Sequence, residues 1–223
     1  MNSVFQIIGP VMVGPSSSHT AGAVLLGLAA RSILGGQPVA ARILLHGSFA
    51  QTYRGHGTDI ALVAGLLGMA PDDERIPDSM RWAKELGLDA SIESADLGDV
   101  HPNTVRMELT GADGRRLDIT GSSIGGGNIV ITRIGKFDVQ FKGENHALVV
   151  SYKDQPGVIA NITSILAGEH VNIATMNVSR EAKHGTALAI IELDQPVSSE
   201  ATALVAQVNG VSTVMSLPPL AVS

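Results

Sequence analysis

Apolar residues in the first part of the chain recur with two different periods. Helical spacing extends from Thr20 to Leu34, from Ile60 to Met69 and from Asp78 to Leu86. The runs typical of strands are ARILLH, VRMELT, RRLDIT, NIVITRI and FDVQF, at positions 41–46, 105–110, 115–120, 128–134 and 137–141. We therefore predict a mixed α+β unit, in which the segment GSSIGGGN at 121–128 is a flexible loop.

The pattern after Gly143 follows a simpler order of elements. Its segments are, in order, the strand ALVVSYKD, the turn and helix DQPGVIANITSILAGEHV, the strands NIATMNVSR and TALAIIELD, the helix SSEATALVAQVNG and the strand VSTVMSL. A βαββαβ order folds as an antiparallel, ferredoxin-like sheet with both helices on one face. The polar segment KGENH reads as a linker, so we predict two domains, 1–142 and 147–223.

Composition narrows the functions that this fold can serve. With 44% hydrophobic and 16% charged residues, the 223-residue chain is apolar enough for two modest globular domains. It has no apolar run of the roughly 18 to 20 residues that a membrane span needs and no basic N-terminal start of a secretory signal, so we expect a cytoplasmic protein. The net charge of -6 and the lack of a dense Lys/Arg cluster argue against nucleic acid as a partner.

The chain contains no cysteine. This excludes a disulfide framework, a thiol nucleophile, and any thiolate-held iron–sulfur cluster or zinc site built by this chain alone. Small molecules or other proteins are therefore the partners to expect, and any soft-metal chemistry must come from another chain.

The segment GPSSSHTAG, at 14–22, places a histidine among hydroxyl side chains just before the first predicted helix. Helix N-termini expose unpaired N–H groups and a partial positive charge, so they favour a substrate carboxylate. The hydroxyls of Ser16, Ser17, Ser18 and Thr20 can add donors, and the imidazole of His19 can exchange a proton near neutral pH. The simpler interpretation is that Ser17 or Ser18 caps the helix and that the histidine is structural.

A second glycine-bounded loop holds His56 just before the second predicted helix. Gly57, Thr58 and Asp59 follow it, and Thr58 or Asp59 is suited to cap that helix. Two such loops, brought together, would form an anion-binding pocket that contains two imidazoles. We therefore treat His19 and His56 as candidate catalytic residues and their polar neighbours as candidate substrate ligands.

Other polar residues carry weaker candidate roles. His46, at a strand end, is better explained as a buried histidine bonded to backbone than as part of the site. His101 and His146 lie in predicted turns and should face solvent. Arg54 is suited either to a bidentate carboxylate contact or to an exposed salt bridge. The serines and glycines at 122–127 suit an amide nest for an anion or, slightly better, a flexible hairpin connector.

The second domain resembles the ACT domain, a regulatory fold that commonly binds small amino acids at a dimer interface. The resemblance rests on the turn DQPGV at 154–158, on Asn161 and on the strand residues NIA at 172–174. It implies a homodimer and a bound amino acid or monovalent cation, although a purely structural dimerisation module would use the same turn. The residues that it assigns to an ACT ligand are Asp154, Pro156, Gly157 and Asn161.

The segments GPSSSHTAG, LHGSFAQTYRGHGTD and GSSIGGGNI, followed by an ACT domain, make the whole chain similar to the β chain of iron–sulfur-dependent bacterial L-serine dehydratases. In that family a fused or separate α part holds a [4Fe–4S] cluster by cysteines, and one iron acts as a Lewis acid on the serine hydroxyl. The resemblance implies conversion of L-serine to pyruvate and ammonia, with His56 as the base and His19 as a second acid–base or orienting group.

Two functions from different classes are open at this point. The first is the β subunit of a two-chain lyase. The second is a stand-alone amino-acid sensor without chemistry, because the first domain of this family is related to an allosteric substrate-binding domain of a serine-pathway dehydrogenase. A cysteine-bearing α chain as partner would favour the first.

Overall fold

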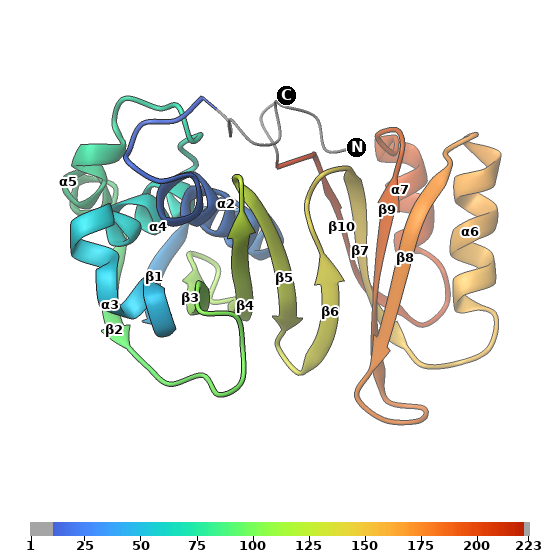
Figure 1. Ribbon diagram of the computed structural model, residues 1–223. Coiled ribbons are helices and arrows are strands. Elements are labelled where there is room, and N and C mark those ends of the chain that lie inside the picture. The colour runs from blue at the N-terminus through green and yellow to red at the C-terminus, as the bar shows by residue number, and fades with distance from the viewer. Residues whose placement is uncertain (1–10, 221–223) are drawn as a thin grey trace, which may run out of the picture. The chain divides into compact units, whose positions relative to one another are not determined.

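The protein forms two compact units, seen in a computed structural model that describes residues 11–220 (Figure 1). The units divide between Gly135 and Lys136. The predicted limits of the family domains, 1–142 and 147–223, lie slightly later and stay a prediction. No helix in the described part of the chain is long and apolar enough to cross a membrane.

The sheet of the first unit runs in the order β2-β1-β3-β4-β5. Its strands are β1 (Pro38–Leu45), β2 (Asp89–Ser94), β3 (Thr104–Gly111), β4 (Arg116–Gly125) and β5 (Asn128–Ile134). The β1 and β2 strands pair in parallel, since the helices between them return the chain to the same end of the sheet. The β1–β3, β3–β4 and β4–β5 pairs are antiparallel.

The helical elements of the first unit position the candidate histidines. They are a π-helical turn η1 (Ser17–Ala21), α2 (Gly22–Leu34), α3 (Gly47–His56), α4 (Thr58–Leu66), a 3-10 turn η2 (Ile76–Asp78) and α5 (Ser79–Glu85). The α2 helix packs on β3, β4 and β5 and lies beside α4 (Figure 1). Leu26, Leu62 and Ile119 are fully buried in this layer, as expected for helices whose apolar stripe faces a sheet.

Two glycines allow α2 and α4 to approach each other closely. A Cβ on Gly27 would overlap the carbonyl oxygen of Leu62, and a Cβ on Gly65 would overlap that of Val24. Backbone therefore packs directly on backbone at this crossing. The two helices are held at a separation that only glycine permits, and this fixes where their preceding segments lie.

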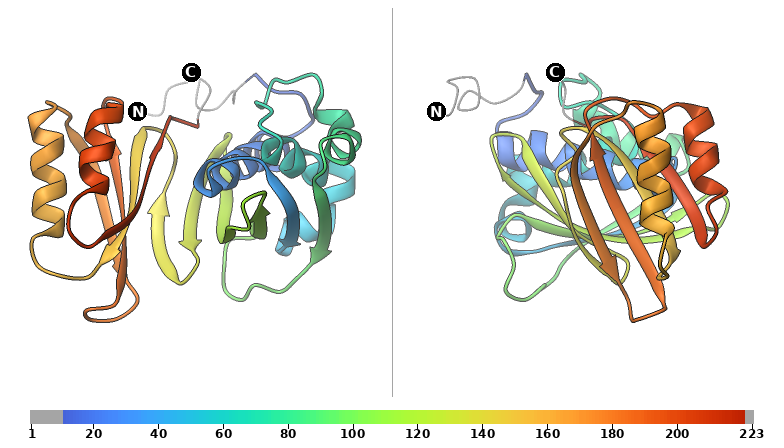
Figure 2. Two further views of the ribbon diagram at one scale, coloured as in Figure 1. Left: turned by 180° about the vertical axis from the view of Figure 1, so that it is seen from behind. Right: turned by 90° about the vertical axis from the view of Figure 1, so that its right-hand side faces the viewer.

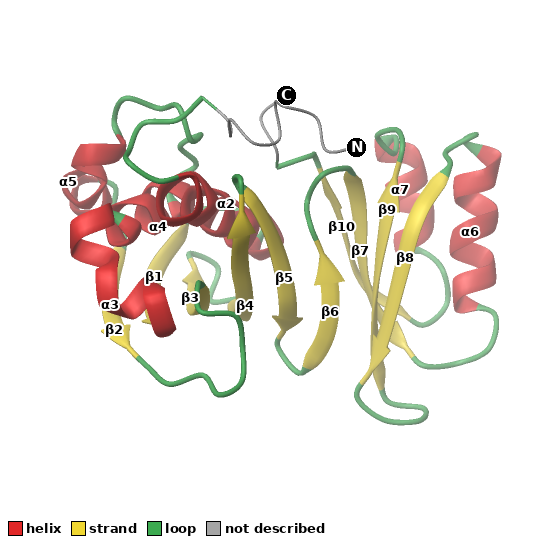
Figure 3. Cartoon of the chain, viewed as in Figure 1, coloured by secondary structure: helices red, strands yellow, loops and turns green. Residues whose placement is uncertain are grey.

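The second unit is a βαββαβ domain with both helices on one face of the sheet (Figures 1 and 3). Its main elements are β7 (His146–Lys153), α6 (Val158–Gly168), β8 (Ile173–Arg180), β9 (Thr186–Leu193), α7 (Ser199–Ala206) and β10 (Val211–Leu217). The sheet order is β10-β7-β9-β8, and neighbouring strands in it are antiparallel. The additional strand β6 (Phe137–Phe141) also belongs to this unit and contacts β8 and β9.

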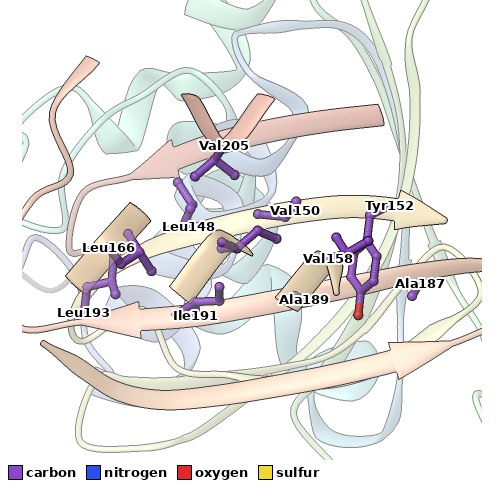
Figure 4. Packing of buried hydrophobic residues seen from close by; sticks show 11 residues of the cluster. Leu148, Val150, Tyr152, Val158, Leu166, Ala187, Ala189, Ile191, Leu193 and Val205 are labelled. Carbon is purple, nitrogen blue, oxygen red and sulfur yellow. The ribbon is translucent and has the colours of Figure 1, made fainter. Parts of the chain in front are cut away.

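Alternating strand positions build the core of the second unit (Figure 4). The rear and side views of Figure 2 show the backbone of this unit, with its two helices on one face of the sheet. Leu148 and Val150 of β7 and Ile191 of β9 point toward the helices, where they meet Leu166 of α6 and Val205 of α7. Every second residue of β7 and β9 joins this cluster, and the positions between them, such as Val149 and Ile190, are also buried. The α+β class and the βαββαβ order are both confirmed.

Three local predictions were wrong. The segment GSFAQTYRGH forms the α3 helix and not the predicted loop. The prediction failed because the segment buries only Phe49 and has no apolar stripe to indicate a helix. The β2 strand was not predicted because DASIES is short and largely exposed. The segment at 121–125 is not a flexible loop but the end of β4, where Ser122 and Ser123 occupy buried positions.

The helix crossing gives a testable prediction. Gly65→Ala should destabilise the protein by about 1 to 3 kcal/mol, because overpacking outweighs the gain of roughly 1 kcal/mol that alanine brings to a helix interior. Gly55→Ala is the matched control, since Gly55 lies in α3 and a Cβ added there would meet nothing within 4 Å. It should be neutral or stabilising in urea denaturation followed by circular dichroism. Equal midpoints for the two variants would contradict the close crossing.

Candidate active site

The segment that carries His19 is a π-helical turn, a rare conformation that is frequent at functional sites. Ser16 begins it: its backbone oxygen accepts from the Thr20 N–H at 2.8 Å, and its side chain accepts from the His19 N–H at 3.1 Å. Ser16 is therefore the N-cap, and the expectation that Ser17 or Ser18 caps the helix was wrong. The latter two are half-buried in the same turn as His19.

The second candidate histidine ends a helix instead of lying in a loop. His56 is the last residue of α3, and α4 begins two residues later at Thr58. Gly57 joins the helices with φ 68°, a left-handed conformation that residues with a Cβ rarely adopt. Neither Thr58 nor Asp59 is the N-cap of α4 as expected, because that position is Gly57, which has no side chain to cap the helix. The sharp corner leaves the His56 side chain exposed.

The structure brings the two histidines together. Their ring centroids lie 4.9 Å apart at an interplanar angle of 75°. The Thr20 hydroxyl, on η1, donates to the His56 carbonyl oxygen at 3.3 Å and so ties the two segments to each other. The His19 ring also meets the Phe49 ring edge to face, with centroids 5.3 Å apart. The pair predicted from two glycine-bounded segments therefore forms a single cluster.

The surroundings of His19 favour a neutral imidazole. Burial lowers the pKa of His19 below its usual value, and the adjacent charge of a protonated His56 lowers it further. Both causes act against the imidazolium form. A histidine held neutral at physiological pH can accept a proton, which is the property that general base or shuttle chemistry requires.

The candidate substrate ligands divide by exposure. Ser17 and Ser18 lie half-buried on the His19 turn, and Asp59, also half-buried, accepts a bond from the Ile60 N–H at 2.9 Å. Thr20 and Thr58, in contrast, are buried. The Thr58 hydroxyl has no hydrogen-bond partner among the described residues. This placement favours Ser17, Ser18 and the Gly57 corner for substrate contact and a structural role for the two threonines.

The weaker candidates lie elsewhere. His46 Nδ1 accepts from the Leu97 N–H at 3.1 Å, so the predicted bond to the backbone is confirmed, although the residue is half-buried and not buried. His101 is exposed as expected, but His146 is half-buried at the start of β7, so its assignment to a solvent-facing turn was wrong. Arg54 is exposed, and its guanidinium contacts the Tyr53 hydroxyl at 3.2 Å.

The two serines of the segment at 122–127 are buried, so their hydroxyls are not available to an anion. The Ser122 hydroxyl bonds to the Thr104 hydroxyl at 2.7 Å in the interior. The Ser123 hydroxyl is buried without a partner among the described residues. A hollow of about 600 Å³ does lie on the open face of the first unit's sheet, but the residues that line it, such as Arg42 and Arg116, include none of the predicted site.

In the ACT turn, Asp154 is already hydrogen-bonded within the protein, whereas the other predicted ligand residues are exposed. The Asp154 carboxylate accepts from the His184 N–H at 3.1 Å and from the Arg180 guanidinium at 3.0 Å. These bonds lower the pKa of Asp154, and the bond from the His184 backbone amide has the larger effect. Asp154 thus links the turn to the β8–β9 hairpin. Pro156, Gly157 and Asn161 are exposed at the start of α6, where a ligand would meet the helix N-terminus.

Sequence reasoning missed one residue of the cluster. The Ser48 hydroxyl lies 3.1 Å from His19 Nε2. Ser48 and His56 are eight positions apart in one helix, which places them on the same side of it. That spacing becomes a usable signal only once α3 is recognised as a helix.

Comparisons with known proteins match both units. A family model described as serine dehydratase beta chain matches residues 3–94, and the ACT domain model matches residues 146–209. The chain is 44% identical to the probable L-serine dehydratase, beta chain, of Bacillus subtilis, over 87% of this chain and 88% of that one. It is 41% identical to the L-serine dehydratase, beta chain, of Peptoniphilus asaccharolyticus, over 88% and 89%. It is 27% identical to D-3-phosphoglycerate dehydrogenase of Synechocystis, over 83% of this chain and 34% of that enzyme.

The coupling within the histidine pair can be measured. His56→Ala should raise the pKa of His19, because it removes a neighbouring positive charge and admits water to the ring. NMR titration of the side-chain resonances follows this directly. His101→Ala is the control, since His101 is exposed and outside the cluster. An unchanged His19 pKa in the His56→Ala protein would show that the rings do not interact in solution.

The role of Asp154 can be tested separately. Asp154→Ala should accelerate hydrogen exchange at the His184 amide, because that N–H loses its acceptor. Asp194→Ala provides a carboxylate deletion in the same unit, at a residue that instead bonds Asn172, and should leave the His184 amide unaffected. If exchange at His184 were the same in both variants, the Asp154 link would not exist.

Proposed function

The chain belongs to the family of L-serine dehydratase β chains, and from this premise we propose that it is the β subunit of a two-chain L-serine dehydratase. Together with an α chain it would convert L-serine into pyruvate and ammonia. The family membership rests on relatives matched over nearly their whole length. The observation within this chain that carries the proposal is the contact between His19 and His56.

The reaction requires a base, because the α-proton of serine is poorly acidic. Removal of that proton and loss of the hydroxyl as water give 2-aminoacrylate, whose imine form reacts with water to give pyruvate and ammonia. We assign His56 as the base, since its ring is exposed and can meet a substrate. His19, half-buried behind it, would exchange the proton with His56 or orient the substrate.

The serine carboxylate would lie against the turn that carries Ser16, Ser17 and Ser18 and the corner formed by Gly57, Thr58 and Asp59. Support comes from the helix starts at these places, whose N–H groups favour an anion, and from the half-buried Ser17 and Ser18 side chains. In this arrangement the Asp59 carboxylate would attract the substrate ammonium group.

The [4Fe–4S] cluster of the family would be held by the α chain. This chain has no cysteine, and its described residues contain no group of three side chains that could hold a metal ion, so they do not fit the cluster. When bound, the cluster would supply Lewis-acid activation of the serine hydroxyl. The part of this chain is to bind the substrate and move the proton.

The ACT unit would form a homodimer and regulate the enzyme. Support comes from its edge strand β8, on which Met176 and Val178 stand exposed; unpaired sheet edges of this kind commonly pair with a second copy. The exposed Pro156, Gly157 and Asn161 would then take an amino acid or a monovalent cation. Light scattering of the full chain should show a dimer, and a monomer at all concentrations would refute this part.

A second candidate is an amino-acid sensor without chemistry. The similarity to D-3-phosphoglycerate dehydrogenase, which spans 83% of this chain, favours it. In that case serine would bind, but no partner would make the complex active. The histidine pair distinguishes the two candidates, since a sensor has no need of two imidazoles in contact.

Reconstitution with a cysteine-bearing α chain tests the proposal. The β chain alone should be inactive, and the anaerobic complex should form pyruvate from L-serine. His56→Ala and His19→Ala should each lower kcat by about 10² to 10⁴-fold, the usual contribution of acid–base groups, with the larger loss at His56. His101→Ala should retain full activity. Activity of the isolated β chain, or full kcat in both histidine variants, would overturn the assignment.

A further inference from the structure

Ser48 has none of the candidate roles that the sequence suggests for its neighbours, yet its hydroxyl holds the ring of His19. We propose that Ser48 is a positioning residue: it accepts a hydrogen bond from His19 Nε2–H and so leaves Nδ1 as the nitrogen that takes and gives the proton. The catalytic consequence rests on the proposed function, whereas the tautomer assignment does not.

The backbone around Ser48 is fixed from both sides. The Ser48 side chain is half-buried in the first turn of α3. The His46 N–H donates to the Thr104 carbonyl oxygen at 3.0 Å, and the Phe49 N–H donates to that of Pro102 at 3.4 Å. A Cβ on Gly47 would lie only 2.7 Å from the Pro102 oxygen. The Ser48 hydroxyl is therefore carried by a helix start that is hydrogen-bonded to the segment at the beginning of β3.

The His19 ring is confined by aromatic neighbours. Phe49, which is fully buried, and His56 both contact it edge to face, at centroid distances of 5.3 and 4.9 Å. Rotation of the imidazole would have to break these contacts together with the 3.1 Å contact between Nε2 and the Ser48 hydroxyl. Nε2 is thus the ring nitrogen that is hydrogen-bonded to Ser48, and Nδ1 is the ring nitrogen that can exchange a proton.

The proposed direction of the bond is the one that leaves Nδ1 free to exchange a proton. A neutral imidazole that accepts a proton at Nδ1 must carry its hydrogen on Nε2, and that hydrogen then donates to Ser48. When Nδ1 becomes protonated, the same bond persists and becomes charge-assisted, hence stronger. The proton that His19 exchanges enters and leaves at Nδ1, and Ser48 neither gains nor loses one. The titratable side chain in contact with the ring is His56.

The first test uses NMR of the isolated β chain, so it does not depend on an α chain. In the unmutated protein at high pH, the ¹⁵N shifts of His19 should show a protonated Nε2 and an unprotonated Nδ1. Ser48→Ala should mix the two tautomers and lower the His19 pKa further, because the charged form loses its stronger bond. Ser48→Thr, which keeps the hydroxyl, should restore both properties.

The matched control is Thr52→Ala. Thr52 lies one turn further along α3, and its hydroxyl donates to the Ser48 carbonyl oxygen at 2.8 Å, not to His19. Its removal deletes a hydroxyl from the same helix and should change neither the tautomer nor the pKa of His19. This separates an effect on the imidazole from a general loosening of the helix.

The second test uses the reconstituted enzyme. Ser48→Ala should lower kcat by about 10 to 100-fold, the loss expected when a hydrogen bond to a charged group is removed, and should move the acidic limb of the kcat profile to lower pH. Ser48→Thr should recover most of kcat.

Each outcome decides a separate question. A rise in the His19 pKa on Ser48→Ala would mean that Ser48 donates to Nε2, and an Nδ1-protonated tautomer in the unmutated chain would mean the same; either overturns the inference. An unchanged tautomer in Ser48→Ala would reduce Ser48 to a structural role. If the unmutated complex does not turn over serine, the proposed function fails while the tautomer result stands.

Discussion

The crossing of α2 and α4 is the contact on which the candidate site depends. At Gly27 and Gly65 the two helix backbones touch, and no other residue fits there without displacing a carbonyl. His19 precedes the first of these glycines by about two helical turns, and His56 precedes the second by a similar length. The Thr20 bond to the His56 carbonyl shows that these leading segments converge. The distance between the imidazoles is therefore set by a backbone packing contact some way from either ring.

The electrostatics of the pair follow from that distance. Burial disfavours the charged form of His19, and the neighbouring charge of His56 adds to this effect. The His56 side chain, in contrast, is exposed to solvent. The two rings are thus unequal although their chemistry is the same. Such inequality is what distinguishes a proton acceptor from a second group that shuttles or orients.

The elements that could be predicted from the sequence are those with a clear pattern in their own residues. The ACT order was readable because short apolar runs mark the strands and DQPG marks the turn. The two histidines were recognisable because each lies among glycines and hydroxyls. The α3 helix was not, since its polar sequence buries only Phe49 and is held in place by tertiary bonds to Pro102 and Thr104. With α3 unrecognised, the partner of His19, which is 29 positions away, was unpredictable.

The burial of individual side chains decides which of the predicted site residues can contact a ligand. Thr20 and Thr58 belong to the same motifs as Ser17 and Ser18, and from sequence all four are equal candidates for substrate contact. In the fold the threonines are buried and the serines are not. The same distinction holds in the ACT unit, where Asp154 is already bonded to the β8–β9 hairpin while Asn161 is exposed. Residues of one sequence motif therefore lie near the same site, but only those that are not buried can contact a ligand.

The exposure of His56 bears on why such a site would be shared between two chains. An imidazole in water is a weak base toward a carbon acid, because water stabilises the substrate and screens every charge that could assist the transfer. His19 is shielded by α3, but nothing in the described part of the first unit covers His56 from the solvent side. Proton abstraction from an amino acid would require that side to be closed. A second chain that carries the metal centre would close it and supply the leaving-group activation in one step of assembly, which is the arrangement the proposed function requires.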